Sequence, residues 1–314
     1  MTPKPIVGVL QAFVCLCLLG VMPIVSNGRP DGFPALSFAV FLSVWQLVCA
    51  LPLFLRDFCG TEKGIFGKSL APRRRWRSFA VTVVTGILFG LATYLYVLGV
   101  ERAGAVSAAI AIQAYPLFAI LWETIFLKRR KTLVEFVFTA VLVLTLYYLG
   151  TGGTWWIEGL SVWFLAALGV PFLWSIAHVI IKEELSNTPI TPAQVTFFRV
   201  LVSLVFLGGL AVAIDPAVLL RDVVRWDFQI FALAMGAVYY LELIVWFHAM
   251  RHIDVSLASS ITTPWPALTM VLAAVFLGET VSAYQIVAFC VVVACIYGLS
   301  AASIRQARAR TVMS

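Results

Sequence analysis

Long runs of apolar residues alternate with short polar segments along almost the whole chain. Most runs contain the ~20 residues that a helix needs to cross a bilayer. Turn-forming residues separate them, for example at Asn27 to Pro34 and at Gly150 to Gly153. The pattern predicts an all-α integral membrane protein whose ten transmembrane helices lie at residues 6–25, 35–55, 79–100, 104–127, 133–149, 159–181, 192–214, 229–250, 254–277 and 282–303.

The composition is typical of a chain that uses the bilayer as its solvent. Of the 314 residues, 62% are hydrophobic and 12% are charged, and the mean hydropathy is +0.99. Ten spans with short connections leave no room for a sizeable soluble domain. The sequence contains no metal-binding Cys or His spacing and no nucleotide-binding or catalytic motif, so we expect a protein that is not an enzyme and needs no cofactor.

The basic residues are distributed unevenly between the loops. With the N-terminus placed in the cytoplasm, 17 of the 22 Lys and Arg residues fall on the cytoplasmic side, four fall on the other side, and Arg199 lies within an apolar run. This bias predicts that both termini are cytoplasmic. The same bias accounts for the net charge of +7, so that charge does not indicate a nucleic-acid partner. Membrane lipids are the expected surroundings. The short loops and the uncleaved first helix favour the bacterial inner membrane.

A repeat at an offset of 150 residues relates the third to fifth runs to the eighth to tenth. The matched positions include prolines and aromatic residues: Tyr96 with Trp246, Ala108 with Ala258, Pro116 with Pro266, Phe126 with Phe276, Leu127 with Leu277, Tyr147 with Tyr297 and Leu149 with Leu299. We therefore expect a first five-helix repeat at 1–152 and a second at 153–314. Because five is odd, the second repeat enters the membrane inverted, as in many secondary carriers.

Three segments carry the motifs of a known family. The stretches AGAVSAAIAIQAYPLFAILWETIFLKRR and VSLASSITTPWPALTMVLAAVFLGET each have a proline in mid-helix. They resemble the fourth-helix segment of the repeats of the drug/metabolite transporter superfamily, EamA type, which has such a proline and a Leu-Gly-Glu end. The second stretch keeps that end at Leu277 to Glu279, whereas the first has Leu127 to Arg129 there. TFFRVLVSLVF around Arg199 resembles the second-helix pattern, with Val40 at the comparable place in the first half.

The resemblance extends over nearly the whole chain and implies a particular kind of protein. It implies a ten-helix carrier of small metabolites, built as two five-helix halves around a central cavity. The resemblance also favours export over uptake, because export is the more common direction in this family. The energy for transport would come from an ion or substrate gradient, with protons as one candidate, and not from ATP.

The strongest candidate for a binding residue is Glu242, near the middle of its run. An unpaired charge there costs ~3 kcal/mol, so the carboxylate is expected to face protein or a watery cavity. Tyr239 and Trp246 share its helix face, and the first repeat presents Phe89 and Tyr96 at matching positions. The set would suit an organic cation or a coupling proton. A buried structural pair with Arg199 is the alternative.

Further candidates lie at the helix breaks in the two halves. Gln113 and Glu123 share a face with Pro116 and would turn an amide and an acid toward the cavity. Trp265 stands between two prolines at the repeat-related break in the second half, and paired breaks are a pointer to a binding site. Extension to the membrane surface explains Glu123 equally well, and kinks that aid packing are an alternative for the prolines.

The sixth run adds an aromatic stripe. Trp174 falls on the same face as His178, and we expect Trp174 to form a wall of the cavity. His178 is close to the end of its run, so we do not include it among the candidate residues.

These observations favour a secondary active transporter that carries a small organic metabolite by alternating access. An amino acid or an organic cation is the favoured substrate, because a carboxylate and aromatic rings dominate the candidate site. A carrier of an anionic or neutral metabolite that uses Arg199 is a second reading, and a reversed charge preference would support it. A membrane-embedded lipid-processing or scaffold protein is the alternative of another class, and it would show no saturable flux. The sequence does not fix an oligomeric state.

Overall fold

A computed structural model describes residues 5–60, 64–66, 72–115, 117–118, 121–122, 133–249, 252, 258 and 261–313. All regular structure in these residues is helical. The helices are α1 (Pro5–Asn27), α2 (Ala35–Cys59), α3 (Pro72–Ala103), α4 (Ala105–Ile112), α6 (Leu133–Gly150), α7 (Val162–Asn187), α8 (Pro192–Ile214), α9 (Pro216–Val223), α10 (Trp226–Ala249), α12 (Trp265–Leu272) and α13 (Ala283–Met313), with a π-helical turn at Ala273–Leu277 and 3₁₀ turns at Gly64–Phe66 and Ile157–Gly159.

The expectation of an all-helical membrane protein is confirmed, while the number of spans stays a prediction. Among the described residues, α1, α2, α3, α8 and α10 are long and apolar enough to cross a membrane. Shorter apolar helices lie within α6, α7 and α13 and across α12 with its π-helical turn. The expected fourth and ninth spans, 104–127 and 254–277, extend partly outside the described residues.

Several helices are longer than their apolar runs. The third begins at Pro72, not residue 79, because proline suits the first helical position and the arginines that follow favour helix. The short helix α9 follows Asp215 and begins at Pro216, in the segment between the predicted spans 192–214 and 229–250. Asp215 Oδ1 accepts hydrogen bonds from the backbone N–H groups of Ala217 (3.1 Å) and Val218 (3.4 Å), so these two residues start a new helix.

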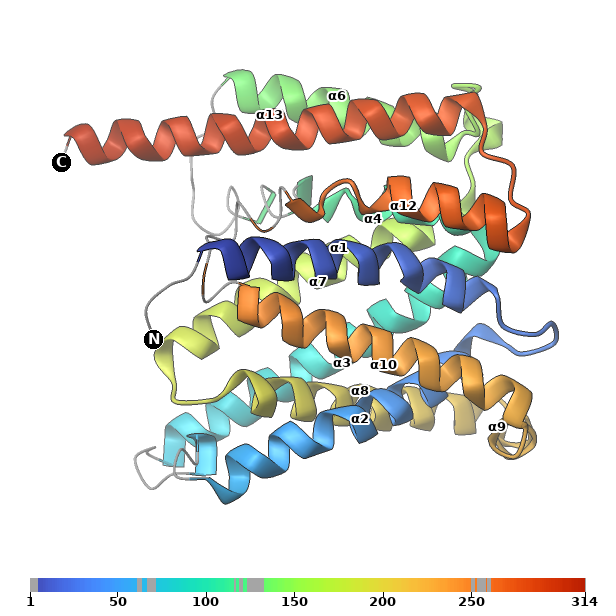
Figure 1. Cartoon of the computed structure of the whole chain (residues 1–314), viewed down its shortest axis with the longest axis vertical. Helices are drawn as coiled ribbons and strands as arrows, with labels where there is room; N and C mark the ends of the chain where they lie inside the picture. Colours follow the sequence, from blue (N-terminus) through green and yellow to red (C-terminus); the bar gives the residue numbers. More distant parts are fainter. Residues whose placement is uncertain are drawn as a thin grey trace.

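Helices of the two expected halves are interleaved in the bundle. The first helix begins and α13 ends at one end of the bundle, called here the terminal end (Figure 1). The contacts come in repeat-related pairs: α1 packs on α10 as α7 packs on α3, α2 on α10 as α8 on α3, and α1 on α12 as α7 on α4. Helices α2 and α8, α4 and α12, and α6 and α13 pack on their own counterparts. This pattern is what a twofold relation between two inverted repeats produces.

The two fourth-helix segments break at equivalent places. Helix α4 ends at Ile112 and a turn follows at Gln113 and Ala114, while a turn at Thr263 and Pro264 precedes α12. Gln113 Nε2 donates a hydrogen bond of 2.9 Å to the Thr263 carbonyl oxygen, and the two residues are 150 apart in sequence. The two breaks therefore meet at the centre of the bundle.

A buried arginine ties two helix ends together at the end opposite the termini. Arg29 lies between α1 and α2, forms an ion pair with Glu101 of α3, and donates to the carbonyl oxygens of Ser26 (2.7 Å) and Phe33 (3.3 Å). Burial lowers the pKa of this guanidinium, and the Glu101 carboxylate opposes that shift. The extensive hydrogen bonding satisfies a charge that would otherwise be costly to bury.

The Leu-Gly-Glu end of the second repeat connects it to the first. Gly278 takes the left-handed conformation, with φ of 65°, and turns the chain after Leu277. Glu279 Oε1 then accepts hydrogen bonds from the Ala105 N–H at the start of α4 (3.0 Å) and from Asn27 Nδ2 at the end of α1 (3.2 Å). The carboxylate thus caps a helix of the other half.

Replacing Glu279 by alanine should lower the thermal unfolding midpoint of the detergent-solubilised protein. A helix cap contributes ~1 kcal/mol, and here the Asn27 amide loses its acceptor as well. The control is Glu158→Ala, which removes an exposed carboxylate from the loop between α6 and α7. Equal midpoints for the two variants would contradict the capping role.

Candidate functional site

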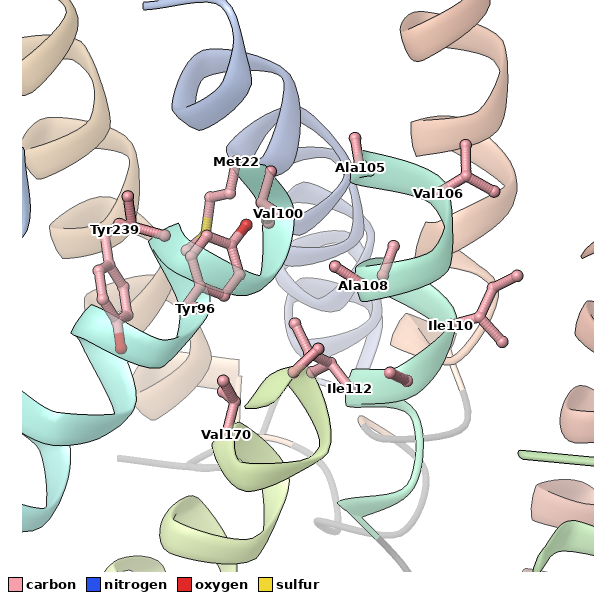
Figure 2. Packing of buried hydrophobic residues seen from close by; sticks show 14 of the residues in the cluster. Met22, Tyr96, Val100, Ala105, Val106, Ala108, Ile110, Ile112, Val170 and Tyr239 are labelled. Atoms are coloured by element: carbon pink, nitrogen blue, oxygen red, sulfur yellow. The ribbon is translucent and has the colours of Figure 1, made fainter. Parts of the chain in front are cut away.

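The central part of α3 presents three site-facing residues on one face. Phe89, Thr93 and Tyr96 are spaced by four and three residues, so they lie on one side of the helix, and all three are buried. Figure 2 shows Tyr96 together with Tyr239 of α10, with Met22 of α1 and Val100 in the same cluster. Aromatic side chains from both expected halves therefore meet.

Helix α10 supplies a buried acid next to this aromatic pair. Glu242 is 8% exposed and follows Tyr239 by one helical turn. Its side chain forms no hydrogen bond or ion pair with any other described residue. Trp246 lies apart from the aromatic pair, since it packs against a separate small cluster that contains Ala12 of α1 and Ala258. The structure thus brings two of the three predicted α10 residues together.

Arg199 of α8 is the positive charge of the site. Its guanidinium carbon lies 4.0 Å from the centroid of the Phe89 ring, in a cation–π contact. Glu242 and Tyr239 are near enough to interact with it electrostatically. Within the described part of the chain, however, Arg199 forms no ion pair within 4.0 Å, so a close salt bridge with Glu242 is absent. Two opposite charges are buried near each other, and neither neutralises the other by direct contact.

Helix α7 contributes two more ring systems. Trp174 lies beside Tyr239, and His178 stands one turn further along the helix. The His178 ring centroid is 5.3 Å from that of Phe89 and 5.7 Å from that of Tyr115. His178 is not among the residues predicted for the site, because it lies near the end of its apolar run. Its four-residue spacing from Trp174 was the signal that could have found it.

The buried Tyr96 hydroxyl has no hydrogen-bond partner among the described residues. Buried polar groups are nearly always paired, so this exception calls for an explanation. Trp174 Nε1 lies close to the Tyr239 hydroxyl, without a hydrogen bond of good geometry. We name the residues Phe89, Tyr96, Trp174, His178, Arg199, Tyr239 and Glu242 the central cluster. It combines an acid, a guanidinium, aromatic faces and one unused hydroxyl.

The other candidate residues have structural surroundings or lie outside the described residues. Gln113 is committed to Thr263 through its amide, and Trp265 is the buried first residue of α12 within the main core. Glu123 and Pro116 lie outside the described residues. Gln113 and Trp265 thus take part in packing at the junction of the two breaks.

A cavity of about 380 Å³ lies at the terminal end of the bundle. It is enclosed by α2, α8, α10 and the segment between α7 and α8, with Arg56, Asp57, Thr188, Ile190 and His248 among its lining residues. None of the residues predicted from sequence lines it. The cavity is on the terminal side of the central cluster, since its lining residues Ile244 and His248 follow Glu242 on α10.

The architecture and the paired helix breaks agree with a known family. The EamA-like transporter family matches residues 6–151 and again residues 161–301. The chain belongs to this family. The sequence resemblance is thus confirmed, and this EamA-like protein is a membrane transporter of the drug/metabolite superfamily. The family is one of transport and not of enzymes.

Comparison with other proteins adds the fold and nothing about the substrate. No curated protein matches the EamA-like chain. One protein of known crystal structure aligns with a TM-score of 0.62 and 14% sequence identity, covering 94% of this chain and 98% of its own. At that identity the likeness shows the fold alone.

The substitution Gln113→Leu should destabilise this EamA-like transporter. It leaves the buried Thr263 carbonyl without its donor, and an unsatisfied buried group costs ~1–3 kcal/mol. The matched control is Gln11→Leu, because the buried Gln11 Oε1 has no partner among the described residues and its removal should be neutral or stabilising. Thermal unfolding in detergent measures both. A smaller midpoint decrease for Gln113→Leu than for Gln11→Leu would refute the role of this contact.

Proposed function

We propose that the protein is a secondary transporter that carries a small amine-bearing metabolite, an amino acid or an organic cation, by alternating access. The observation that carries the proposal is Glu242, a buried carboxylate without a hydrogen bond or ion pair to any described residue. A carboxylate within the membrane is costly unless a charge or a hydrogen-bond donor compensates it. The ammonium group of a substrate would supply both.

The aromatic residues around Glu242 support an amine as the ligand. Tyr239 is near enough to the carboxylate to interact with it electrostatically, and Tyr96 lies beside Tyr239. Ring faces attract a cation, most strongly where water is excluded. The unpaired Tyr96 hydroxyl is available to orient a polar atom of the ligand. In the central cluster a few polar groups lie among apolar walls, which is the usual composition of a small-molecule site.

Arg199 favours an amino acid within this class. Phe89 covers one face of the guanidinium, while its N–H groups make no hydrogen bond to another described residue. A guanidinium with free N–H groups matches a carboxylate in a bidentate manner. A zwitterion would therefore place its ammonium at Glu242 and its carboxylate at Arg199. The same guanidinium supports a second candidate function, the transport of an anionic metabolite.

The interleaved helices support alternating access between two halves. Their contacts come in repeat-related pairs, so one set can loosen while its counterpart tightens. We propose export as the direction, on the family resemblance, and the bacterial inner membrane as the location. A lipid-processing or scaffold protein would give no saturable flux of a water-soluble substrate.

Purified protein should be stabilised by amine-bearing ligands in a thermal-shift screen, because a ligand that binds only the folded state raises its stability. The panel is L-leucine, tetraethylammonium, a nucleobase and a monocarboxylate. We expect the amines to raise the midpoint and Glu242→Gln to weaken their apparent affinity at least ~10-fold, the equivalent of ~1.4 kcal/mol.

The control for the screen is Glu158→Gln, an exposed carboxylate changed in the same way. Its response to amines should equal that of the parent protein. Stabilisation by the monocarboxylate alone, lost in Arg199→Gln, would replace the amine proposal by the anionic one. Equal amine responses in the parent and Glu242→Gln would remove Glu242 from the site.

The proposed orientation predicts the reactivity of Cys59, an exposed thiol at the last residue of α2. The terminal end should face the cytoplasm, so a membrane-impermeant maleimide should label Cys59 in inside-out vesicles and not in right-side-out vesicles. Cys59→Ser identifies the labelled thiol, since Cys17 and Cys290 are exposed within apolar helices. Labelling only in right-side-out vesicles would reverse the orientation.

A further inference from the structure

A second buried carboxylate lies outside the central cluster. Glu184 is 6% exposed and stands near the end of α7, at the terminal end of the bundle. Ser78 of α3 donates a hydrogen bond to its Oε1. One hydroxyl is a small compensation for a buried carboxylate, which can accept about four hydrogen bonds when ionised. The proposed substrate site does not use this acid.

A small void of about 10 Å³ adjoins Glu184. Thr82, Thr85 and Glu184 supply its polar lining, and Val81, Ile181, Ile190 and Val195 supply the apolar part. Thr82 and Thr85 donate their hydroxyl hydrogens to backbone carbonyl oxygens of α3, at 2.9 and 2.7 Å, so their oxygens remain free to accept. The void is at the lower limit for one water molecule, and three polar residues are enough to hold one.

The void lies directly between the central cluster and the cavity at the terminal end. On each of three helices a residue that lines the void is one turn from a residue of the cluster: Thr85 and Phe89 on α3, Ile181 and His178 on α7, Val195 and Arg199 on α8. On its other side, Ile190 lines both the void and the cavity of about 380 Å³. Glu184 thus lies between the cavity at the terminal end and the central cluster.

Each helix that lines the void carries charged residues. On α7, Lys182 and Glu183 directly precede Glu184 in sequence, and their side chains lie outside the described part of the structure. Helix α3 carries Arg73, Arg74, Arg75 and Arg77 in the turns before Ser78, all exposed. Helix α8 carries Arg199 one turn deeper, and residues 188–198 contain no ionisable side chain. Among the described residues that line the void, Glu184 is the one carboxylate.

We propose that Glu184 is the proton-exchange residue that connects the central cluster with the cytoplasmic solution, a role that rests on the proposed transport function. The Glu242 carboxyl, protonated from the opposite side of the membrane, gives its proton to a water in the void, and that water gives one of its own protons to the Glu184 carboxylate. The net change is one O–H bond broken at Glu242 and one formed at Glu184. Release of the Glu184 proton to the cavity and the cytoplasm resets the step.

The test uses full-length protein in liposomes, with labelled L-leucine or tetraethylammonium outside and a pH-sensitive dye inside. Exchange of labelled for unlabelled substrate needs no net proton movement. Net flux of substrate that is coupled to protons does need it. In Glu184→Gln we expect exchange within about twofold of the parent protein and proton movement reduced at least ~10-fold, with the pH dependence of flux lost.

Glu184→Asp should restore proton movement, and Thr85→Val, which removes a water partner at constant shape, should slow it. Ser78→Ala removes the hydrogen bond and keeps the acid, so its coupling should equal that of the parent.

Should Glu184→Gln fail to fold, the aspartate and Thr85 variants decide the matter. Normal proton movement in Glu184→Gln, or an equal loss of exchange and proton movement, overturns the role of Glu184. A parent protein that exchanges neither substrate would instead refute the transport proposal.

Discussion

The hydrogen bond from the Gln113 amide to the Thr263 carbonyl sits where the two halves of the bundle leave helical geometry together. In lipid every backbone polar group needs a partner inside the protein, so a helix can break only where another part of the chain satisfies it. Here the first half supplies the donor that the break in the second half needs. Of the helices that carry the central cluster, α3 and α7 pack on α4, so their positions depend most directly on this junction.

Symmetry of the scaffold does not extend to its chemistry. Helix pairs recur on both sides of the pseudo-twofold axis, yet the position that matches Glu242 is Ala92 and the place comparable to Arg199 is Val40. Both of these residues are buried and apolar. The inverted repeat therefore builds a symmetric frame, and a few substitutions in one half place both charges on a single side of it. A ligand bound there would meet a directed pattern of charge.

Sequence patterning predicts the frame well because lipid imposes strong rules. The approximate positions of most helices, the repeat offset and the Leu277 to Glu279 end follow from apolar runs and local motifs, and the family match likewise covers two repeats. The exact lengths do not follow, since α3 extends beyond its apolar run. Tyr96, Tyr239 and Glu242 also follow, since helical periodicity fixes which residues share a face. The rest depends on tertiary packing. No local signal shows that Trp246 packs near Ala12 of α1, or that the Gln113 amide donates its hydrogen bond to the Thr263 carbonyl oxygen. Nor does any show that the His178 ring contacts Phe89 and Tyr115.

The two buried acids differ in a way that fits two roles. Glu242 has aromatic neighbours and a nearby guanidinium, so its surroundings suit an organic ligand. Glu184 has hydroxyl neighbours and a void of water size, which suit a proton and little else. The void beside Glu184 lies one turn from Phe89 on α3, His178 on α7 and Arg199 on α8. A single movement of these three helices would therefore change the surroundings of the void and of the central cluster together.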